Sequence, residues 1–105
     1  MKPKMIDWEE TGSVLQNLRQ GNLNLRRNVC RELRLDLGEC AGDCNACTKE
    51  MDRSISRNEL AKVFCVSENT VTNWERGITP VGVADLLFYC ELTGLSFEDI
   101  LIFAK

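Results

Sequence analysis

Residues 56–80 read SRNELAKVFCVSENTVTNWERGITP, a stretch that predicts two short helices meeting at a tight turn. Ser56 is a typical N-cap residue, and Glu59 three positions later completes a capping box for the first helix. Ser67 offers a second N-cap after the turn, and Gly77 offers a C-cap for the second helix. The apolar side chains of both helices recur with helical spacing and are expected to face inward: Leu60, Ala61, Phe64, Val71 and Trp74.

The second helix of this pair is expected to turn a polar face outward. Once Val71 and Trp74 face inward, Thr70 lies at the edge, and the outward residues are Glu68, Asn69, Thr72, Asn73 and Arg76. Asn, Thr and Arg side chains supply donors and acceptors that suit base edges and phosphates. An ordinary helical hairpin with a solvated polar face would show the same alternation, so geometry alone leaves both interpretations open.

The residue order of this stretch resembles the phage-repressor type of helix-turn-helix, the XRE family, which includes the lambda and 434 repressors and Cro. The resemblance is carried by ELA at residues 59–61, VS at 66–67 and TVTNWERG at 70–77, with Pro80 close behind, and it extends to Phe103. One departure lies at the turn, where the family usually has Gly and this chain has Cys65. A left-handed backbone conformation there would be mildly strained for Cys.

The resemblance implies an all-α fold, a lambda-repressor-like five-helix globule with an extra N-terminal helix and a cysteine-containing insertion between the first core helix and the helix-turn-helix. It also implies a sequence-specific, repressor-like transcriptional regulator that reads the major groove of double-stranded DNA with the helix at residues 68–76. The DNA-binding residues that it implies are Arg57, Glu68, Asn69, Thr70, Thr72, Asn73 and Arg76. One such motif reads only about half a turn of DNA, so we expect a homodimer on a pseudo-palindromic site.

The chain is expected to divide into an N-terminal part and a DNA-binding domain. Residues 1–22 form an arm and the extra helix, which starts at Asp7 or Thr11 and covers an exposed hydrophobic edge. Residues 23–105 form the helix-turn-helix DNA-binding domain, with the insertion at residues 38–55.

Three further helices are expected within this domain. A helix over residues 23–37 buries Cys30, Leu33 and Leu37, with Val29 joining the stripe, and exposes Arg26, Arg27, Arg31 and Arg34. After Pro80, a helix over residues 81–93 buries Val83, Leu86, Leu87 and Cys90. Ser96 then caps a last helix, whose apolar anchors are Ile100, Leu101 and Phe103.

The insertion contains three cysteines with Cys-x3-Cys-x2-Cys spacing: Cys40, Cys44 and Cys47. Thiolates this close can share a zinc ion or an iron–sulfur cluster. Because the chain has no histidine, a fourth ligand would be a carboxylate, an exogenous group or another cysteine such as Cys30 or Cys65. The same three cysteines, with Met51 and Ile55, also fall on one helical face, where free Cys packs as a small hydrophobe. We favour packing, and therefore expect neither a metal nor another cofactor.

Length and composition place the chain among single-domain proteins without a membrane span. At 105 residues it is one domain by size, and no run approaches the roughly 20 apolar residues of a span. The N-terminus lacks the apolar region of a secretory signal, so we expect a cytoplasmic protein. The net charge of −3 opposes DNA binding, and residues 81–105 carry the largest acidic excess. Binding to DNA would therefore need an asymmetric charge distribution or the help of dimerisation.

The sequence does not indicate an enzyme, because it has no histidine, no Gly-rich phosphate loop and no evident carboxylate pair. Two alternatives to a plain DNA-binding regulator remain open. One is a protein–protein interaction module on the same fold, which Glu68 favours because phosphate repels a carboxylate that does not accept from cytosine. The other is a metal- or redox-responsive regulator that acts through Cys40, Cys44 and Cys47.

Overall fold

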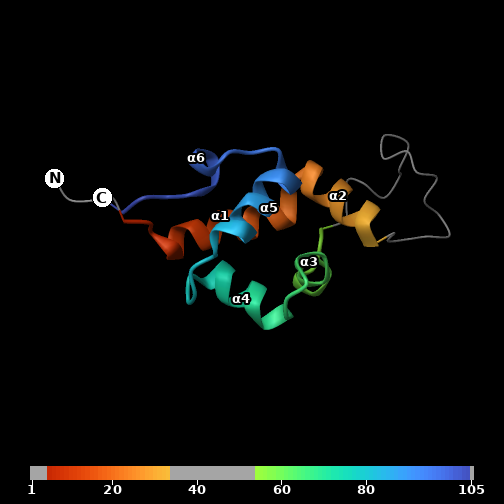
Figure 1. Cartoon of the computed structure of the whole chain (residues 1–105), viewed down its shortest axis with the longest axis horizontal. Helices are drawn as coiled ribbons and strands as arrows, with labels where there is room; N and C mark the ends of the chain where they lie inside the picture. Colours follow the sequence, from red (N-terminus) through yellow and green to blue (C-terminus); the bar gives the residue numbers. More distant parts are fainter. Residues whose placement is uncertain (1–4, 34–53, 105) are drawn as a thin grey trace.

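The computed structural model describes residues 5–33 and 54–104, and the regular elements within these ranges are all helices (Figure 1). In chain order they are α1 (Trp8–Gly21), α2 (Leu23–Leu33), α3 (Arg57–Phe64), α4 (Glu68–Arg76), α5 (Val83–Thr93) and α6 (Phe97–Ile100). The predicted all-α class is confirmed. Predictions for Arg34, Leu37, Cys40, Cys44, Cys47 and Met51, and with them most of the insertion at 38–55, fall outside the described residues.

The helix-turn-helix of α3 and α4 forms where the sequence predicts it, because each end has a local cap. The backbone N–H of Glu59 donates to Ser56 Oγ (3.1 Å), and Glu59 Oε1 accepts from the Ser56 N–H (3.0 Å). At the start of α4, Ser67 Oγ accepts from the Thr70 N–H (3.1 Å). The turn residue Cys65 has φ 57° and ψ 39°. This is the left-handed conformation anticipated from the sequence, which is mildly strained for any residue with a Cβ.

An aromatic cluster joins α3, α4 and α5. The Phe64 ring lies at its centre, with its centroid 5.5 Å from Trp74, 4.8 Å from Phe88 and 4.7 Å from Tyr89. Trp74 is 5% exposed, which confirms its predicted place in the core. Edge-on contacts between rings at such distances add to the free energy gained by burying their apolar area.

α1 belongs to the centre of this core, whereas the sequence predicts a helix that covers an outer edge. It lies against α4 on one side and α6 on the other (Figure 1). A Cβ at Gly12 would stand 2.5 Å from the backbone oxygen of Glu75 and 2.6 Å from that of Trp74, so only glycine fits. Leu15 is fully buried. The N-terminal helix thus contributes a close backbone contact to the core. Its predicted start at Asp7 is confirmed, since Asp7 Oδ1 caps the Glu10 N–H (3.0 Å).

α2 buries a different face from the predicted one. Val29 is buried and Arg31 exposed as predicted, but Leu25 is buried while Cys30 and Leu33 are only half-buried. Two arginines predicted outside are not exposed, since Arg26 is buried and Arg27 half-buried. The cause is the contact with α5, where the Asn28 side chain donates to the Leu92 carbonyl (3.0 Å). The Asn24 side chain likewise donates to the Thr93 carbonyl (3.3 Å). These amides turn α2 so that Leu25 and Val29 face the core.

α5 also differs from the prediction in the face that it buries. Leu86 is buried as expected, together with Tyr89 and Leu92, whereas Val83 is 70% and Leu87 49% exposed. Cys90 is half-buried, and burial raises the pKa of its thiol. Because α5 is apolar nearly all round, the spacing of its apolar residues does not identify the buried face. The buried face is the one on which Tyr89 packs against the aromatic cluster.

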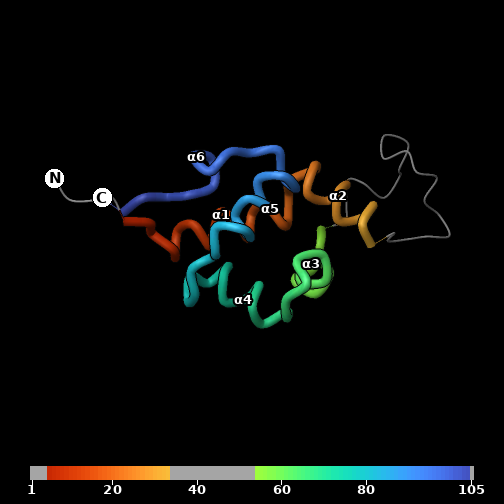
Figure 2. Tube along the Cα trace, viewed as in Figure 1, coloured from red at the N-terminus to blue at the C-terminus, as the bar shows by residue number. Residues whose placement is uncertain are grey.

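The two ends of the described chain lie side by side (Figure 2). Ile6 pairs with Phe103 in an antiparallel bridge, the Asp7 N–H donates to the Ile102 carbonyl (2.7 Å), and the Ala104 N–H donates to that of Met5 (2.8 Å). Of the predicted anchors near α6, Ile100 is buried and Leu101 half-buried, but Phe103 is exposed, because its segment pairs along the surface.

Candidate nucleic-acid interface

α4 gathers six of the seven predicted contact residues on one nine-residue helix. Glu68, Asn69 and Arg76 are exposed, and Thr70, Thr72 and Asn73 are half-buried. The opposite face of α4 is closed, with Val71, Trp74 and Glu75 buried. The predicted division of this helix into an inner and an outer face is therefore present in the structure.

The outer side chains of α4 differ in the donors and acceptors that they leave available. Thr70 shares a hydrogen bond between its hydroxyl and that of Ser67 (2.9 Å), and the Thr72 hydroxyl donates to the Glu68 carbonyl (3.1 Å). Within residues 5–33 and 54–104, the Asn69 and Asn73 side chains have no hydrogen-bond partner. Their amides can each present a donor and an acceptor to a base edge.

A buried ion network holds the inner face of α4. The Glu75 carboxylate, which is not exposed, accepts from Arg19 Nε (2.7 Å) and Arg19 Nη2 (3.0 Å). Arg57 Nε of α3 donates to the same carboxylate (3.0 Å). Arg19 Nη1 adds a bond to the Ile55 carbonyl (2.8 Å), just before α3. One carboxylate therefore ties α4 to α1 and α3, and removing either side of such a buried pair costs about 3–5 kcal/mol.

This network also sets the position of Arg57, which the sequence places at the DNA surface. Its side chain is 26% exposed, with Nε committed to Glu75. Arg57 thus lies at the border between the core and the surface, beside the start of α3. Sequence reasoning missed Arg19 and Glu75. The only local signal was the position of Glu75 next to Trp74, on the inner side of α4.

The hydroxyl of Tyr89 lies near this network and is buried. Desolvation by burial, and then the charge of Glu75, raise the pKa of Tyr89 above its usual value, so the group is neutral at physiological pH. In the described part of the chain its oxygen has no hydrogen-bond partner. Tyr89 therefore contributes mainly its ring to the packing.

The C-terminal end of α4 rests on the N-terminal end of α1. Gly77 closes α4 with φ 74°, and a Cβ there would stand 2.6 Å from Glu9 Cα. Together with the contact at Gly12, this fit fixes the direction of α4 against α1. A helix whose C-terminal end is fixed in this way presents its outer face in one orientation.

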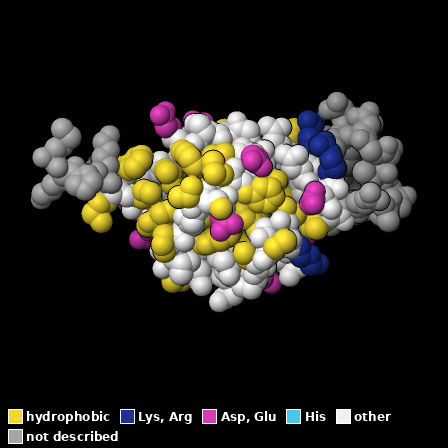
Figure 3. Space-filling view, in the orientation of Figure 1, with side chains coloured by type: hydrophobic (Ala, Val, Ile, Leu, Met, Phe, Trp, Pro, Cys, Tyr) yellow, Lys and Arg dark blue, Asp and Glu magenta, His cyan; other side chains and the backbone are white. Residues whose placement is uncertain are grey.

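Charge is distributed unevenly over the molecule. Figure 3 shows apolar side chains over the face that α5 and α6 form, with scattered Asp and Glu side chains. The Lys and Arg side chains visible in this view lie near the α2 end. A surface of this composition is unsuited to phosphate, and residues 81–105, which include α5 and α6, carry the largest acidic excess of the chain.

The described residues carry no indication of a metal or of a membrane span. No group of three Cys, Asp or Glu side chains among them is placed to hold a metal, and Cys30, Cys65 and Cys90 are free thiols. None of the described helices combines the length and the hydropathy needed to cross a bilayer. Cys40, Cys44 and Cys47 lie outside these residues, so the expectation of no metal there stays a prediction.

Comparison with known proteins gives one match. Residues 50–100 fit the family model described as Helix-turn-helix, and the matched range contains α3, α4 and α5 and ends at the last residue of α6. No curated protein and no solved structure is significantly similar to the chain.

Proposed function

Residues 50–100 belong to the phage-repressor type of helix-turn-helix, the XRE family of DNA-binding transcriptional regulators, and from this premise we propose that the chain is a repressor-like regulator that reads a specific sequence in the major groove with α4. The observation that carries the proposal is the outer face of α4. The side-chain amides of Asn69 and Asn73 have no hydrogen-bond partner among the described residues. The opposite face of the helix is packed into the core through the buried residues Trp74 and Glu75. Because the backbone of this helix is already fixed, binding costs only the ordering of the side chains themselves.

The charged residues take separate roles in this proposal. Arg76 is exposed at the end of α4 and contacts phosphate, as does the outer part of the Arg57 guanidinium. Glu68, at the first position of α4, accepts from the amino group of a cytosine. Thr70 and Thr72 contact phosphate or neighbouring groups through their hydroxyls.

We further propose that two copies bind together on a pseudo-palindromic site. Ile78, just after α4, is 64% exposed, and Val83 and Leu87 of α5 are exposed as well. Exposed apolar side chains favour contact with another protein surface. Because these three follow α4 closely in the chain, such a contact suits a two-fold pairing that presents two α4 helices to successive grooves. Sedimentation of the chain alone and with one duplex site tests this, and a monomer in both states contradicts it.

Selection of bound duplexes from random DNA by the full chain, followed by gel shifts, tests the reading by α4. Asn69→Ala and Asn73→Ala should each lose about 1–3 kcal/mol of discrimination between the selected and random duplexes. Asn17→Ala, at an exposed position of α1, is the matched control and should bind as the wild type does. Equal discrimination by all three variants would remove Asn69 and Asn73 from the interface. Failure to enrich any sequence would contradict the proposed function and favour a protein-binding module.

The absence of an obligatory metal remains part of the proposal. Protein purified without added metal should contain no stoichiometric zinc or iron by elemental analysis. Metal that is lost when Cys40, Cys44 and Cys47 are replaced by Ala would instead support a metal-responsive regulator.

A further inference from the structure

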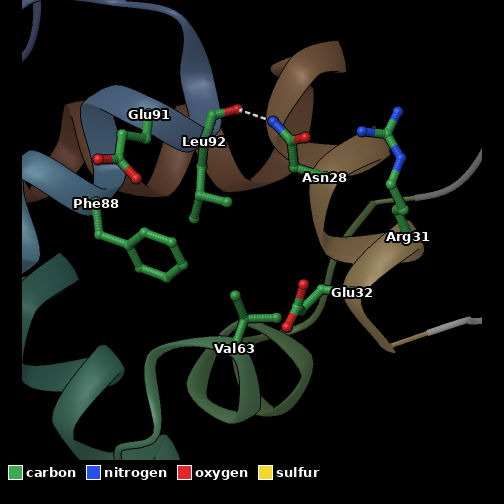
Figure 4. Close-up of a pocket in the computed structure, with 7 residues that line it drawn as sticks. All are labelled: Asn28, Arg31, Glu32, Val63, Phe88, Glu91 and Leu92. Atoms are coloured by element: carbon green, nitrogen blue, oxygen red, sulfur yellow. Dashed lines mark hydrogen bonds between the residues drawn. The ribbon is translucent and has the colours of Figure 1, made fainter.

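A half-open pocket of about 260 Å³ lies between α2, α3 and α5 (Figure 4). Val63, Phe88 and Leu92 supply its apolar wall, one from α3 and two from α5. In Figure 4 these three side chains point toward a common space. The pocket is therefore a concave apolar site built by three helices of the core.

The polar side chains around this pocket carry more negative than positive charge. Asn28 is already engaged, because its amide donates to the Leu92 carbonyl (3.0 Å). Figure 4 shows the Arg31 guanidinium extending away from Phe88, whereas the Glu32 carboxylate lies beside Val63 and that of Glu91 lies at the opposite rim, on the far side of Leu92. Among the described residues neither carboxylate has an ion-pair or hydrogen-bond partner.

We propose that this pocket binds a small organic cation, an amine with an aromatic or branched alkyl body. The body packs against Phe88 and Leu92, and the ammonium group lies beside the Glu32 carboxylate, while the Glu91 carboxylate adds negative charge at the opposite rim of the pocket. The face of an aromatic ring attracts a cation, and two unpaired carboxylates repel an anion. At about 260 Å³ the pocket lies just below the usual range of small-molecule sites, so the expected ligand is small.

The pocket is connected to α4 through contacts between aromatic rings. Phe88 lies 4.8 Å from Phe64, centroid to centroid, and Phe64 lies 5.5 Å from Trp74 of α4. A ligand on Phe88 and Val63 therefore touches both α5 and α3, and is separated from Trp74 by one side chain. Binding should change the surroundings of Trp74. The expected effect of the ligand on DNA affinity rests on the proposed function, whereas the binding of the ligand to the pocket does not.

Tryptophan fluorescence provides the test, because the chain has two tryptophans, Trp8 and Trp74. In a Trp8→Phe background of the full chain, 2-phenylethylammonium should produce a saturable change in the emission of Trp74, and the anion 3-phenylpropionate should not. The combined Glu32→Gln and Glu91→Gln variant should bind the cation about fivefold more weakly, because it loses one partly exposed ion pair and the negative charge at the opposite rim. Glu98→Gln, an exposed change on α6, is the matched control and should bind as the parent does.

Three results would overturn the proposal: no saturable change with the cation, equal binding of the anion, or undiminished binding by the variant that lacks both carboxylates. Glu32 and Glu91 are exposed, so that variant should fold, and a thermal melt by circular dichroism verifies this. Gel shifts with and without the cation then separate the two proposals. Ligand binding without any DNA binding leaves the pocket standing and removes the proposed function. DNA affinity that is identical with and without the bound cation removes the link to α4.

Discussion

Replacing Glu75 by Gln tests the buried ion network with almost no change in side-chain shape. The substitution removes the negative charge that faces Arg19 and Arg57. Arg19, with a side chain only 9% exposed, is left as an uncompensated cation in the core. Arg57 is 26% exposed and can turn toward water. Most of the loss should therefore come from Arg19.

The size of the effect follows from this geometry. Breaking a buried ion pair from one side costs about 3–5 kcal/mol. The Gln amide oxygen still accepts one hydrogen bond, so we expect the lower end, about 3 kcal/mol, out of the 5–15 kcal/mol typical of a domain. With an m value of about 1.5 kcal/mol per M, the midpoint of urea unfolding should fall by about 2 M.

Urea unfolding followed by tryptophan fluorescence measures this change. Glu68→Gln, an exposed carboxamide change on the same helix, is the control and should remain within about 0.5 kcal/mol of the wild type. Arg57→Gln should cost less than Arg19→Gln, since Arg19 is the more buried cation and donates three of the bonds. A Glu75→Gln variant that loses less than about 1 kcal/mol would refute the reasoning, because the network would then be worth no more than a surface pair.

Three other substitutions test the core, the α1–α4 contact and the turn. Trp74→Ala should destabilise the fold by about 3–5 kcal/mol, because it empties a large buried site, and a melting temperature within a few degrees of the wild type would contradict its burial. Gly12→Ala should lower the urea midpoint strongly, since its Cβ would stand 2.5 Å from the Glu75 oxygen, whereas Gly21→Ala, with open space around it, should be neutral or gain up to about 1 kcal/mol. Similar midpoints for these two alanine variants would argue against the close α1–α4 contact. Cys65→Gly should stabilise the fold by about 0.5 kcal/mol. Glycine relieves the strain of the left-handed conformation, and its greater entropy in the unfolded chain offsets part of that gain. A destabilised variant would show that Cys65 is not strained.

The helix-turn-helix could be predicted from the sequence because its determinants are local. The caps at Ser56 and Ser67 lie within three residues of the groups that they bind, and Gly77 closes α4 by its own backbone freedom. The inner positions of α3 and α4 follow one regular period. The fold class follows from these elements, and the family match at residues 50–100 agrees with it.

The remaining errors have a common physical cause, which is that the deciding contacts join distant parts of the chain. Arg19 and Glu75 are 56 positions apart, so neither sequence neighbourhood shows the ion pair that brings α1 into the core. The orientation of α2 depends on an amide bond from Asn28 to Leu92, 64 positions away. In α5 the apolar residues surround the helix, so no period identifies the side that Tyr89 occupies. The outer face of α4 is present as predicted, whereas its contacts with DNA stay predictions.

The pairing of Ile6 with Phe103 has a consequence for the connectivity of the chain. Because the Ala104 N–H donates to the Met5 carbonyl (2.8 Å), a linker that joined these two residues directly would span a short distance. Cyclisation would then lower the entropy of the unfolded chain while leaving the folded contacts as they are. The chain could then begin at a different helix while the helices keep their positions in the fold. A circular permutant opened at an exposed turn, such as the one at Thr79 and Pro80, could present the same α4 surface with a different helix first.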